Sequence, residues 1–319
     1  MTGMDNDLRA AAETAVEACL GLVADESIAV VTDDERLPIG EAIYDVAAAQ
    51  SDDATLLRYP VGTEHGEEPP APVAAAMREA DAFLAPTTYS ITHTRARQAA
   101  TEAGARGATL PGITENVLVA GLDADYEQIA AACESIHEQV RGADEIRVTA
   151  PGGTDIVVEP GDRPWHLDTG LVRDPGSFSN LPAGETFVSP TTANGRIVVD
   201  GTMRPHGLVE EPVQIEVEAG QVVEVSDAGV RESLEAAAEN ADDPDAVYNL
   251  AELGVGANVG VAELMGSVLL DEKAAGTVHL AVGDDASIGG DVEAPIHSDG
   301  VVRDPTVRAD GEAITLPSP

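Results

Sequence analysis

Lysine is almost absent from this sequence, and basic residues of either kind are few. Lys273 is the only lysine, and 17 basic residues face 58 acidic ones, which gives a formal net charge of −41. No basic patch exists that could neutralise phosphates, so nucleic-acid binding is excluded. Repulsion among the carboxylates destabilises a compact state in dilute salt and is screened within about 3 Å at 1 M ionic strength. The composition resembles that of proteins from salt-accumulating halophilic archaea; an acidic protein of ordinary habitat is the alternative.

Aromatic residues, cysteines and long apolar runs are also scarce. Aromatics make up 3 % of the chain, so the cores must be built mainly from Val, Ala, Leu and Ile. The two cysteines, Cys19 and Cys133, exclude a disulfide framework and a cysteine-based zinc site. No apolar run approaches the roughly 18 residues needed to cross a bilayer, and the N-terminus lacks the positive charge of a signal peptide. We therefore expect a cytoplasmic protein that does not interact with membranes.

The two halves of the chain differ in pattern. Residues 1–143 alternate β-rich runs, such as SIAVVTD at 27–33, with helical segments such as LPIGEAIYDVAAAQ at 37–50. Such alternation indicates βαβ units and a mostly parallel sheet. Residues 144–319 contain strand after strand, interrupted by one clear helix at 229–243. At 319 residues the chain is long enough for two domains. We predict an α/β domain over 1–143 and a β-rich α+β domain over 144–319.

A histidine and an aspartate near the C-terminus are candidate metal ligands. His297 and Asp299 stand at positions i and i+2 of the stretch HSDG, and such residues point to the same side of an extended segment. Imidazole and carboxylate together suit zinc, cobalt, iron or manganese. A surface histidine in a turn is the alternative explanation for His297.

Three further residues could complete such a site. Glu252 lies between an apolar run and a Gly-rich loop, Glu185 lies in a turn that leads into a strand, and His279 is centred in the β-type run TVHLAV. An unpaired buried charge is costly, so each needs a partner. Taken singly, each is explained by a salt-bridged glutamate or a hydrogen-bonded core histidine. With His297 and Asp299, the set has the right size for two divalent ions that share a bridging carboxylate.

Several segments resemble, in order, the aminopeptidase T family of metallopeptidases. They are NLPAGETFVSP at 180–190, AELGVGAN at 251–258, LDEKAAGTVHLAVG at 270–283 and HSDG at 297–300, and SITHTRARQAATEAGARGATLPGIT at 90–114 extends the likeness over most of the chain. The resemblance implies a two-domain homodimer that binds two divalent ions in its C-terminal domain. It also implies an aminopeptidase, a hydrolase that removes N-terminal amino acids from short peptides.

The resemblance assigns the five candidate residues to one metal centre. Its motifs place ligands on Glu185, Glu252, His279, His297 and Asp299, and they make Glu185 and Glu252 the catalytic glutamates. The implied cofactors are two divalent ions, zinc, cobalt or manganese, which would lower the pKa of a shared water to produce hydroxide near neutral pH.

The sequence departs from this pattern at one point and leaves alternatives open. The family's peptidases carry a tyrosine a few residues past the histidine matched by His279, but this chain reads AVGDDASIGG there. A dihydroxypyridine ring-cleaving dioxygenase resembles the same family and uses a single iron held by histidine and aspartate. His279, His297 and Asp299 would fit such a two-histidine, one-carboxylate site. The alternatives are therefore a mononuclear iron dioxygenase of the same fold and a non-catalytic metal-binding relative. A surface ion pair between Glu272 and Lys273 is one explanation of the single lysine; a specific role is the other.

Overall fold

The computed structural model describes residues 3–318 and divides into two compact units. The first comprises the residues up to Tyr126 together with Gly170–Ala183, and the second comprises Glu127–Thr169 together with the residues from Gly184 onward. The predicted boundary lies between residues 143 and 144, whereas the units interleave along the chain. The segment 170–183 returns to the first unit because its strand β8 (Phe178–Asn180) pairs with β4 (Arg106–Pro111).

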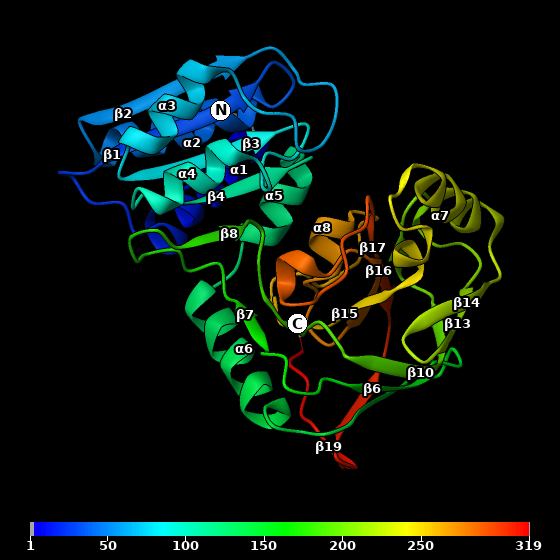
Figure 1. The fold of residues 1–319 in the computed structure, drawn as a ribbon. Coiled ribbons are helices and arrows are strands. Elements are labelled where there is room, and N and C mark those ends of the chain that lie inside the picture. The colour runs from blue at the N-terminus through cyan, green and yellow to red at the C-terminus, as the bar shows by residue number, and fades with distance from the viewer. Residues whose placement is uncertain (1–2, 319) are drawn as a thin grey trace. The chain divides into compact units, whose positions relative to one another are not determined.

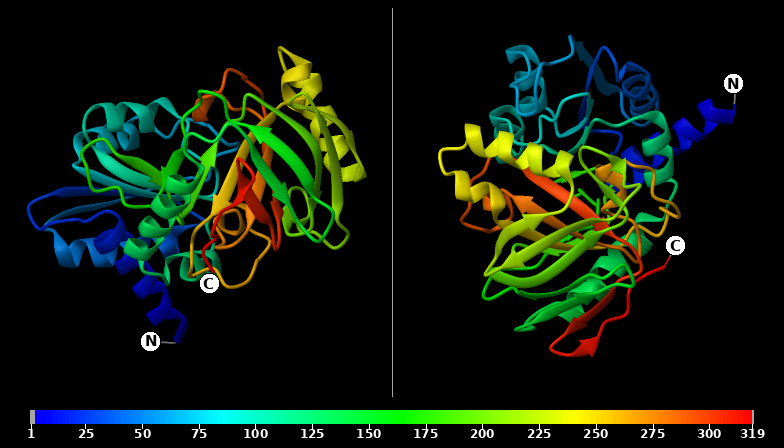
Figure 2. Two further views of the ribbon diagram at one scale, coloured as in Figure 1. Left: turned by 90° about the horizontal axis from the view of Figure 1, so that it is seen from below. Right: turned by 90° about the vertical axis from the view of Figure 1, so that its right-hand side faces the viewer.

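A five-stranded parallel sheet forms the centre of the first unit (Figure 1). The strand order is β2-β1-β3-β4-β8, and each neighbouring pair is parallel. Strands β1 and β3 are buried along nearly their whole length, as expected for a parallel sheet covered on both faces. The remaining strands and the helices that cover the sheet (Figure 2) are β1 (Ser27–Asp33), β2 (Asp53–Tyr59), β3 (Ala82–Thr87), α1 (Gly3–Glu13), the π-helix η1 (Thr14–Cys19), α2 (Leu37–Gln50), α3 (Ala71–Glu79), α4 (Arg95–Glu102) and α5 (Glu115–Leu122).

Two seven-stranded antiparallel sheets form the second unit. The first has the order β14-β13-β10-β6-β5-β18-β19. Its strands are β5 (Ile146–Thr149), β6 (Asp155–Glu159), β10 (Thr192–Val199), β13 (Val213–Glu218), β14 (Gln221–Val225), β18 (Thr306–Ala309) and β19 (Glu312–Ala313). The helical elements of this unit are α6 (Tyr126–Val140), α7 (Ala228–Asn240), η2 (Pro244–Tyr248), α8 (Val268–Asp271) and η3 (Ala286–Ile288). Helix α7 coincides with the one helix that the sequence predicts in this half.

The second sheet of this unit carries the candidate ligands. Its order is β12-β11-β17-β16-β15-β9-β7. Its strands are β7 (His166–Asp168), β9 (Glu185–Val188), β11 (Thr202–Met203), β12 (Gly207–Leu208), β15 (Leu250–Gly256), β16 (Val278–Gly283) and β17 (His297–Val302). Every residue of β15 and β16 is buried, so a polar side chain on either strand must find its partner inside the protein. The predicted fold class, an α/β domain with a mostly parallel sheet and a β-rich α+β domain, is confirmed.

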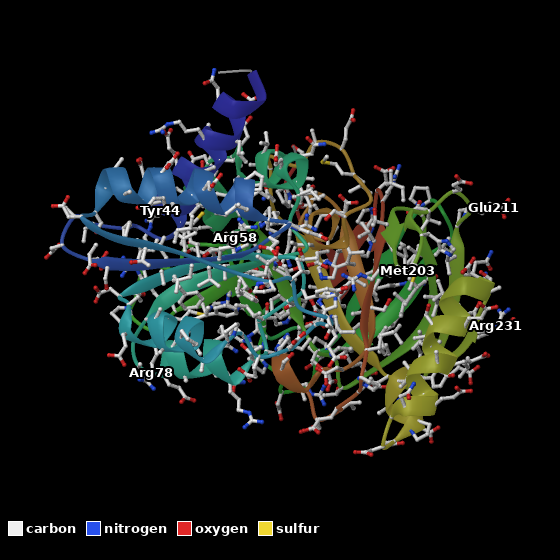
Figure 3. The ribbon with its side chains drawn as sticks, turned by 90° about the horizontal axis from the view of Figure 1, so that it is seen from above. Tyr44, Arg58, Arg78, Met203, Glu211 and Arg231 are labelled. Carbon is white, nitrogen blue, oxygen red and sulfur yellow. The ribbon has the colours of Figure 1, made fainter. Side chains whose placement is uncertain are left out.

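The surface reflects the acidic composition. Several arginines pair with exposed acids, as Arg58 does with Asp34 at 2.6 Å and Arg78 with Glu79 at 2.8 Å. Figure 3 labels both arginines. Within residues 3–318, no helix is long and apolar enough to cross a membrane.

Candidate metal centre

Four neighbouring strands of one sheet carry all five predicted ligands. Glu185 begins β9, Glu252 lies on β15, His279 lies on β16, and His297 and Asp299 lie on β17. These strands are adjacent in the order β17-β16-β15-β9. Strands β9 and β17, which begin more than 100 residues apart in the sequence, thereby belong to one run of four neighbouring strands.

The strand register places these side chains on one face of the sheet. Glu252 pairs with Ala281 of β16, which in turn pairs with Asp299 of β17. His279 stands two residues before Ala281, and His297 stands two residues before Asp299. Because directly paired residues and residues at i and i+2 share a face, all four ligands point the same way.

Glycines on β15 make room for the group. Glu185 pairs with Gly256, which lies four residues after Glu252 and shares its face. Gly254 pairs with His279, and a Cβ at Gly254 would overlap the imidazole ring. The absence of a side chain at Gly254 is therefore what allows the His279 ring to lie against β15.

Glu252 links the two histidines. Its Oε1 atom lies 3.0 Å from Nε2 of His279, and its Oε2 atom lies 3.4 Å from Nε2 of His297. Nε2 of His279 is also 3.2 Å from Oε2 of Glu185, and Nε2 of His297 is 3.4 Å from Oδ1 of Asp299. Donor atoms that bind a common ion at about 2.1 Å are separated by roughly 3 Å, which is the spacing seen here.

The donors form two overlapping groups. Glu185, Glu252 and His279 make one, and Glu252, His297 and Asp299 make the other; within each, the ligand atoms lie within 4.8 Å of one another. Glu185, Glu252 and His279 are buried, whereas about a third of the His297 side chain is exposed. The centre is therefore closed at Glu185 and accessible from His297.

The loop between β16 and β17 holds His297 in place. Nδ1 of His297 lies 2.7 Å from the backbone carbonyl of Asp284, to which it donates, and this leaves Nε2 facing the carboxylates. The loop itself is anchored by the buried Asp285. That carboxylate accepts hydrogen bonds from Ser189 at 2.9 Å, from the backbone NH of Val292 at 2.7 Å and from Arg163 at 3.2 Å. Sequence reasoning missed Asp285 because nothing in its local pattern shows which distant residues it contacts.

Lys273 is buried against the same group. Its ammonium forms an ion pair with Glu185 and lies 2.8 Å from Oε1 of Glu272, and its side chain is 5 % exposed. The interpretation of Glu272 and Lys273 as a surface pair is therefore wrong. The sequence carried one signal of this, namely that Lys273 is the single lysine of the chain.

The two imidazoles are drawn toward their charged forms. Burial opposes the charge on His279, but the hydrogen bond to Glu252 and the charges of Glu185, Glu252 and Glu272 outweigh burial and raise its pKa to about 9. Burial also opposes the charge on His297, but Asp299 and Glu252 raise its pKa well above the usual value. Both shifts have the same cause, a local excess of negative charge.

The carboxylates respond in two ways. Burial alone would raise the pKa of Glu252, but hydrogen bonds from both histidines lower it to about 2. The charge of His297 similarly overcomes burial and lowers the pKa of Asp299 below its usual range. Burial dominates at Glu185 and raises its pKa to about 8, although Lys273 acts in the opposite direction. The burial of this carboxylate thus outweighs the attraction of the ammonium.

These residues fit a divalent metal ion. Oε2 of Glu185 is buried and has no hydrogen-bond partner within the described part of the chain. The excess of carboxylates calls for positive charge, and imidazole nitrogens with carboxylate oxygens are the donors of zinc, iron, cobalt and manganese sites. The structure therefore supports a metal cofactor.

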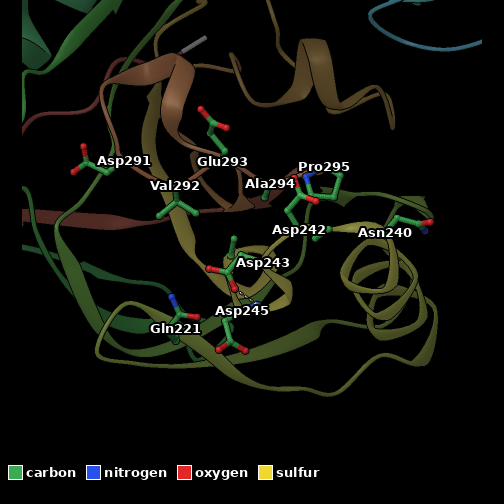
Figure 4. Close-up of a pocket in the computed structure, with 12 residues that line it drawn as sticks. Gln221, Asn240, Asp242, Asp243, Asp245, Asp291, Val292, Glu293, Ala294 and Pro295 are labelled. Atoms are coloured by element: carbon green, nitrogen blue, oxygen red, sulfur yellow. Dashed lines mark hydrogen bonds between the residues drawn. The ribbon is translucent and has the colours of Figure 1, made fainter.

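A separate cavity of about 750 Å³ lies in the second unit and includes none of the five ligands (Figure 4). Five acids line it, namely Asp242, Asp243, Asp245, Asp291 and Glu293. Acidic linings are expected throughout a chain with a net charge of −41, so this cavity carries no functional assignment.

Solved structures with this fold include a dioxygenase and an aminopeptidase T. The structure of 2,5-dihydroxypyridine dioxygenase from Pseudomonas putida KT2440 matches with a TM-score of 0.77 and 19 % identity, over 97 % of this chain and 95 % of that one. Wild-type AmpT from Thermus thermophilus matches with a TM-score of 0.67 and 18 % identity, over 97 % of this chain and 99 % of that one. At such identities the matches show the fold alone. No curated protein sequence matches the chain.

A family model distinguishes between these two relatives. The model of 2,5-dihydroxypyridine 5,6-dioxygenase matches residues 23–317, which is nearly the whole chain. The expected hydrolase, a metallo-aminopeptidase, is therefore wrong, and the resemblance to aminopeptidase T reflects a shared fold. The fold is common to both relatives, and histidine with carboxylate donors suits both kinds of chemistry, so the motifs alone could not separate ring cleavage from peptide hydrolysis. The chain belongs to the 2,5-dihydroxypyridine 5,6-dioxygenase family.

Proposed function

We propose that the protein is an iron-dependent dioxygenase that opens the ring of a hydroxylated pyridine. The family match supports this reaction class, and 2,5-dihydroxypyridine is the first substrate to test. The observation that carries the proposal is the convergence of His279, His297 and Asp299 around Glu252 on three neighbouring strands. Two histidines and one carboxylate form the donor set of non-haem Fe(II) oxygenases.

We assign the ion to His279, His297 and Asp299, with Glu252 as a further oxygen donor. The carboxylate of Glu252 contacts the Nε2 atoms of both imidazoles, and these are the atoms that would bind the ion. A carboxylate oxygen of Glu252 would therefore lie within reach of the same ion. A bound ferrous ion supplies the redox chemistry with dioxygen that ring cleavage requires.

The chain's own residues prepare this site in three ways. The Asp284 carbonyl accepts a hydrogen bond from Nδ1 of His297, so that the neutral form of the ring carries no proton on Nε2. Gly254 leaves space for the His279 ring. The exposed part of His297 marks the side from which a small aromatic ring can approach, because Glu185 and His279 are fully enclosed.

The proposal is tested with protein purified without oxygen in molar KCl, stripped of metal and loaded with Fe(II). We expect iron-dependent loss of the ring absorbance of 2,5-dihydroxypyridine. We expect His297→Ala and Asp299→Asn to abolish this loss while the far-ultraviolet circular dichroism stays unchanged. Arg58→Gln serves as the matched control, since its ion pair lies on the surface of the first unit and should not affect turnover. Wild-type turnover in either ligand variant would discard the assignment.

A further inference from the structure

The donor atoms leave room for more than one cation. Glu185, Glu252 and His279 form one group, Glu252, His297 and Asp299 form the other, and Glu252 belongs to both. A carboxylate shared between two donor groups is the arrangement that two bridged metal ions require. A mononuclear centre built from these residues needs something that keeps a second ion out.

We propose that the ammonium of Lys273 is the resident second cation of this centre and restricts it to one metal ion. The inference rests on the proposed mononuclear iron function and adds the residue that sets the number of ions. Lys273 acts through Glu185 and Glu272, and it is therefore a positioning residue.

The contacts of Lys273 support this role. Its Nζ atom is bonded to Glu185 and lies 2.8 Å from Glu272, so two of the carboxylates nearest the first donor group are already engaged by a positive charge. A second divalent ion held by Glu185 would lie across one carboxylate from this ammonium, and the two cations would repel each other with little water between them. The second donor group includes no carboxylate that bonds to Lys273, and its His297 is partly exposed, so an ion can enter there.

The backbone fixes Lys273 at this place. It follows α8, where its NH donates to the carbonyl of Leu270 at 3.0 Å, and its own carbonyl accepts from the NH of Asn258 at 2.8 Å. Two backbone hydrogen bonds thus hold the segment from which the Lys273 side chain extends into the cluster of carboxylates. Lys273 is also the single lysine of the chain, whose other basic residues are arginines. A compact ammonium can take the position of a metal ion, whereas a planar guanidinium cannot.

The test is a count of bound ions. Metal-free protein in molar KCl is loaded with Co²⁺, passed through a desalting column and analysed for cobalt per chain, together with the visible absorption spectrum of bound Co²⁺. We expect one Co²⁺ in the wild type and two in Lys273→Met, with a second set of absorption bands. Lys273→Met combined with Glu185→Gln should return the count to one, because it removes the carboxylate that the second ion needs.

Removal of a buried charge can also affect folding, so a second variant is required. The double variant Lys273→Met, Glu272→Gln loses one charge of each sign, and we expect it to fold. It should bind two Co²⁺ ions, with a lower affinity than the single variant Lys273→Met. Two ions in the wild type, or one ion in both folded variants, would overturn the inference. Failure of both variants to fold in saturating Co²⁺ would overturn it as well, because a second ion should replace the missing ammonium.

The outcome is separable from that of the proposed function. Wild-type protein that binds one ion but cleaves no ring would refute the dioxygenase proposal and leave the role of Lys273 intact. Wild-type protein that binds two ions and cleaves the ring would do the reverse.

Discussion

Gly254 lies directly beneath the imidazole of His279, and a single methyl group at this position would overlap the ring. The two residues are paired across β15 and β16, so neither strand can move away without breaking the sheet. Close approach of a ring to bare backbone is a reason for glycine in the interior of a strand. The metal centre therefore depends on a residue that contributes no atom to it.

Gly254→Ala should displace the His279 ring and weaken metal binding. Overpacking of a rigid interior costs about 1–3 kcal/mol, so we expect a loss of that size in the free energy of unfolding. We also expect Co²⁺ affinity to fall at least about 10-fold, which is the effect of losing a residue that orients a metal ligand. Urea unfolding and Co²⁺ titration measure the two effects. Gly152→Ala, in the turn between β5 and β6 of the other sheet, is the control and should leave Co²⁺ affinity unchanged. Unchanged affinity in Gly254→Ala as well would contradict the role of this contact.

Asp285→Asn should loosen the loop that positions His297. The buried carboxylate accepts from Arg163, Ser189 and Val292, and the amide cannot accept all of these bonds, so we expect a loss of about 1–3 kcal/mol in the free energy of unfolding. Asp291→Asn is a matched control, because Asp291 contacts the same Arg163 at 3.2 Å but its side chain is 95 % exposed. We expect the control to change stability by less than about 0.5 kcal/mol. Equal effects of the two substitutions would show that Asp285 is not the anchor.

Metal-free protein should lose stability as the pH rises from about 6.5 to about 9. The pKa of His279 is raised from 6.5 to about 9, so the stability that its charged form contributes is present below 6.5 and is lost as the pH passes through 9. Ionisation of Glu185, whose pKa is raised to about 8, acts in the same direction. Metal binding requires deprotonated ligands, so protein loaded with Co²⁺ should show the opposite trend over this range. The melting temperature is measured at pH 6.5 and pH 9, once with a chelator and once with Co²⁺. A melting temperature that changes with pH in the same direction in both samples would contradict the prediction.

Lowering the salt concentration should destabilise the whole protein. With a net charge of −41, repulsion between carboxylates is weak at molar salt and grows as the screening length increases in dilute buffer. We expect the melting temperature to fall steeply between about 2 M and about 0.1 M KCl. Sucrose at equal osmolality is the control and should not replace KCl. A melting temperature that is the same at both salt concentrations would favour the alternative of an acidic protein from an ordinary habitat.

Local patterns in the sequence were sufficient for the fold class and for part of the site. The alternation of strands and helices before residue 143 predicts the parallel sheet, and the spacing of His297 and Asp299 predicts that both face one side, as they do in β17. Strand β8 could not be predicted, because it joins the first sheet by pairing with a strand about 70 residues earlier. The burial of Lys273 was hidden for the same reason, since its partner Glu185 lies 88 residues away.

The reaction class could not be predicted from the motifs. The donors suit both a two-ion hydrolase and a one-iron oxygenase, and Glu252 lies where either would need a carboxylate. The difference depends on charges around the donors, such as that of Lys273, and these become visible only when distant segments are in contact.

The central claim is that one iron in this centre supports cleavage of a hydroxylated pyridine ring by dioxygen. Its most direct test follows oxygen consumption and ring absorbance together, in wild-type protein that contains one Fe(II) per chain in molar KCl. The account predicts that one O₂ disappears for each molecule of 2,5-dihydroxypyridine lost, and that neither changes in metal-free protein. Folded protein with one iron per chain that consumes no oxygen in the presence of this substrate, or of other hydroxylated pyridines, would contradict the account.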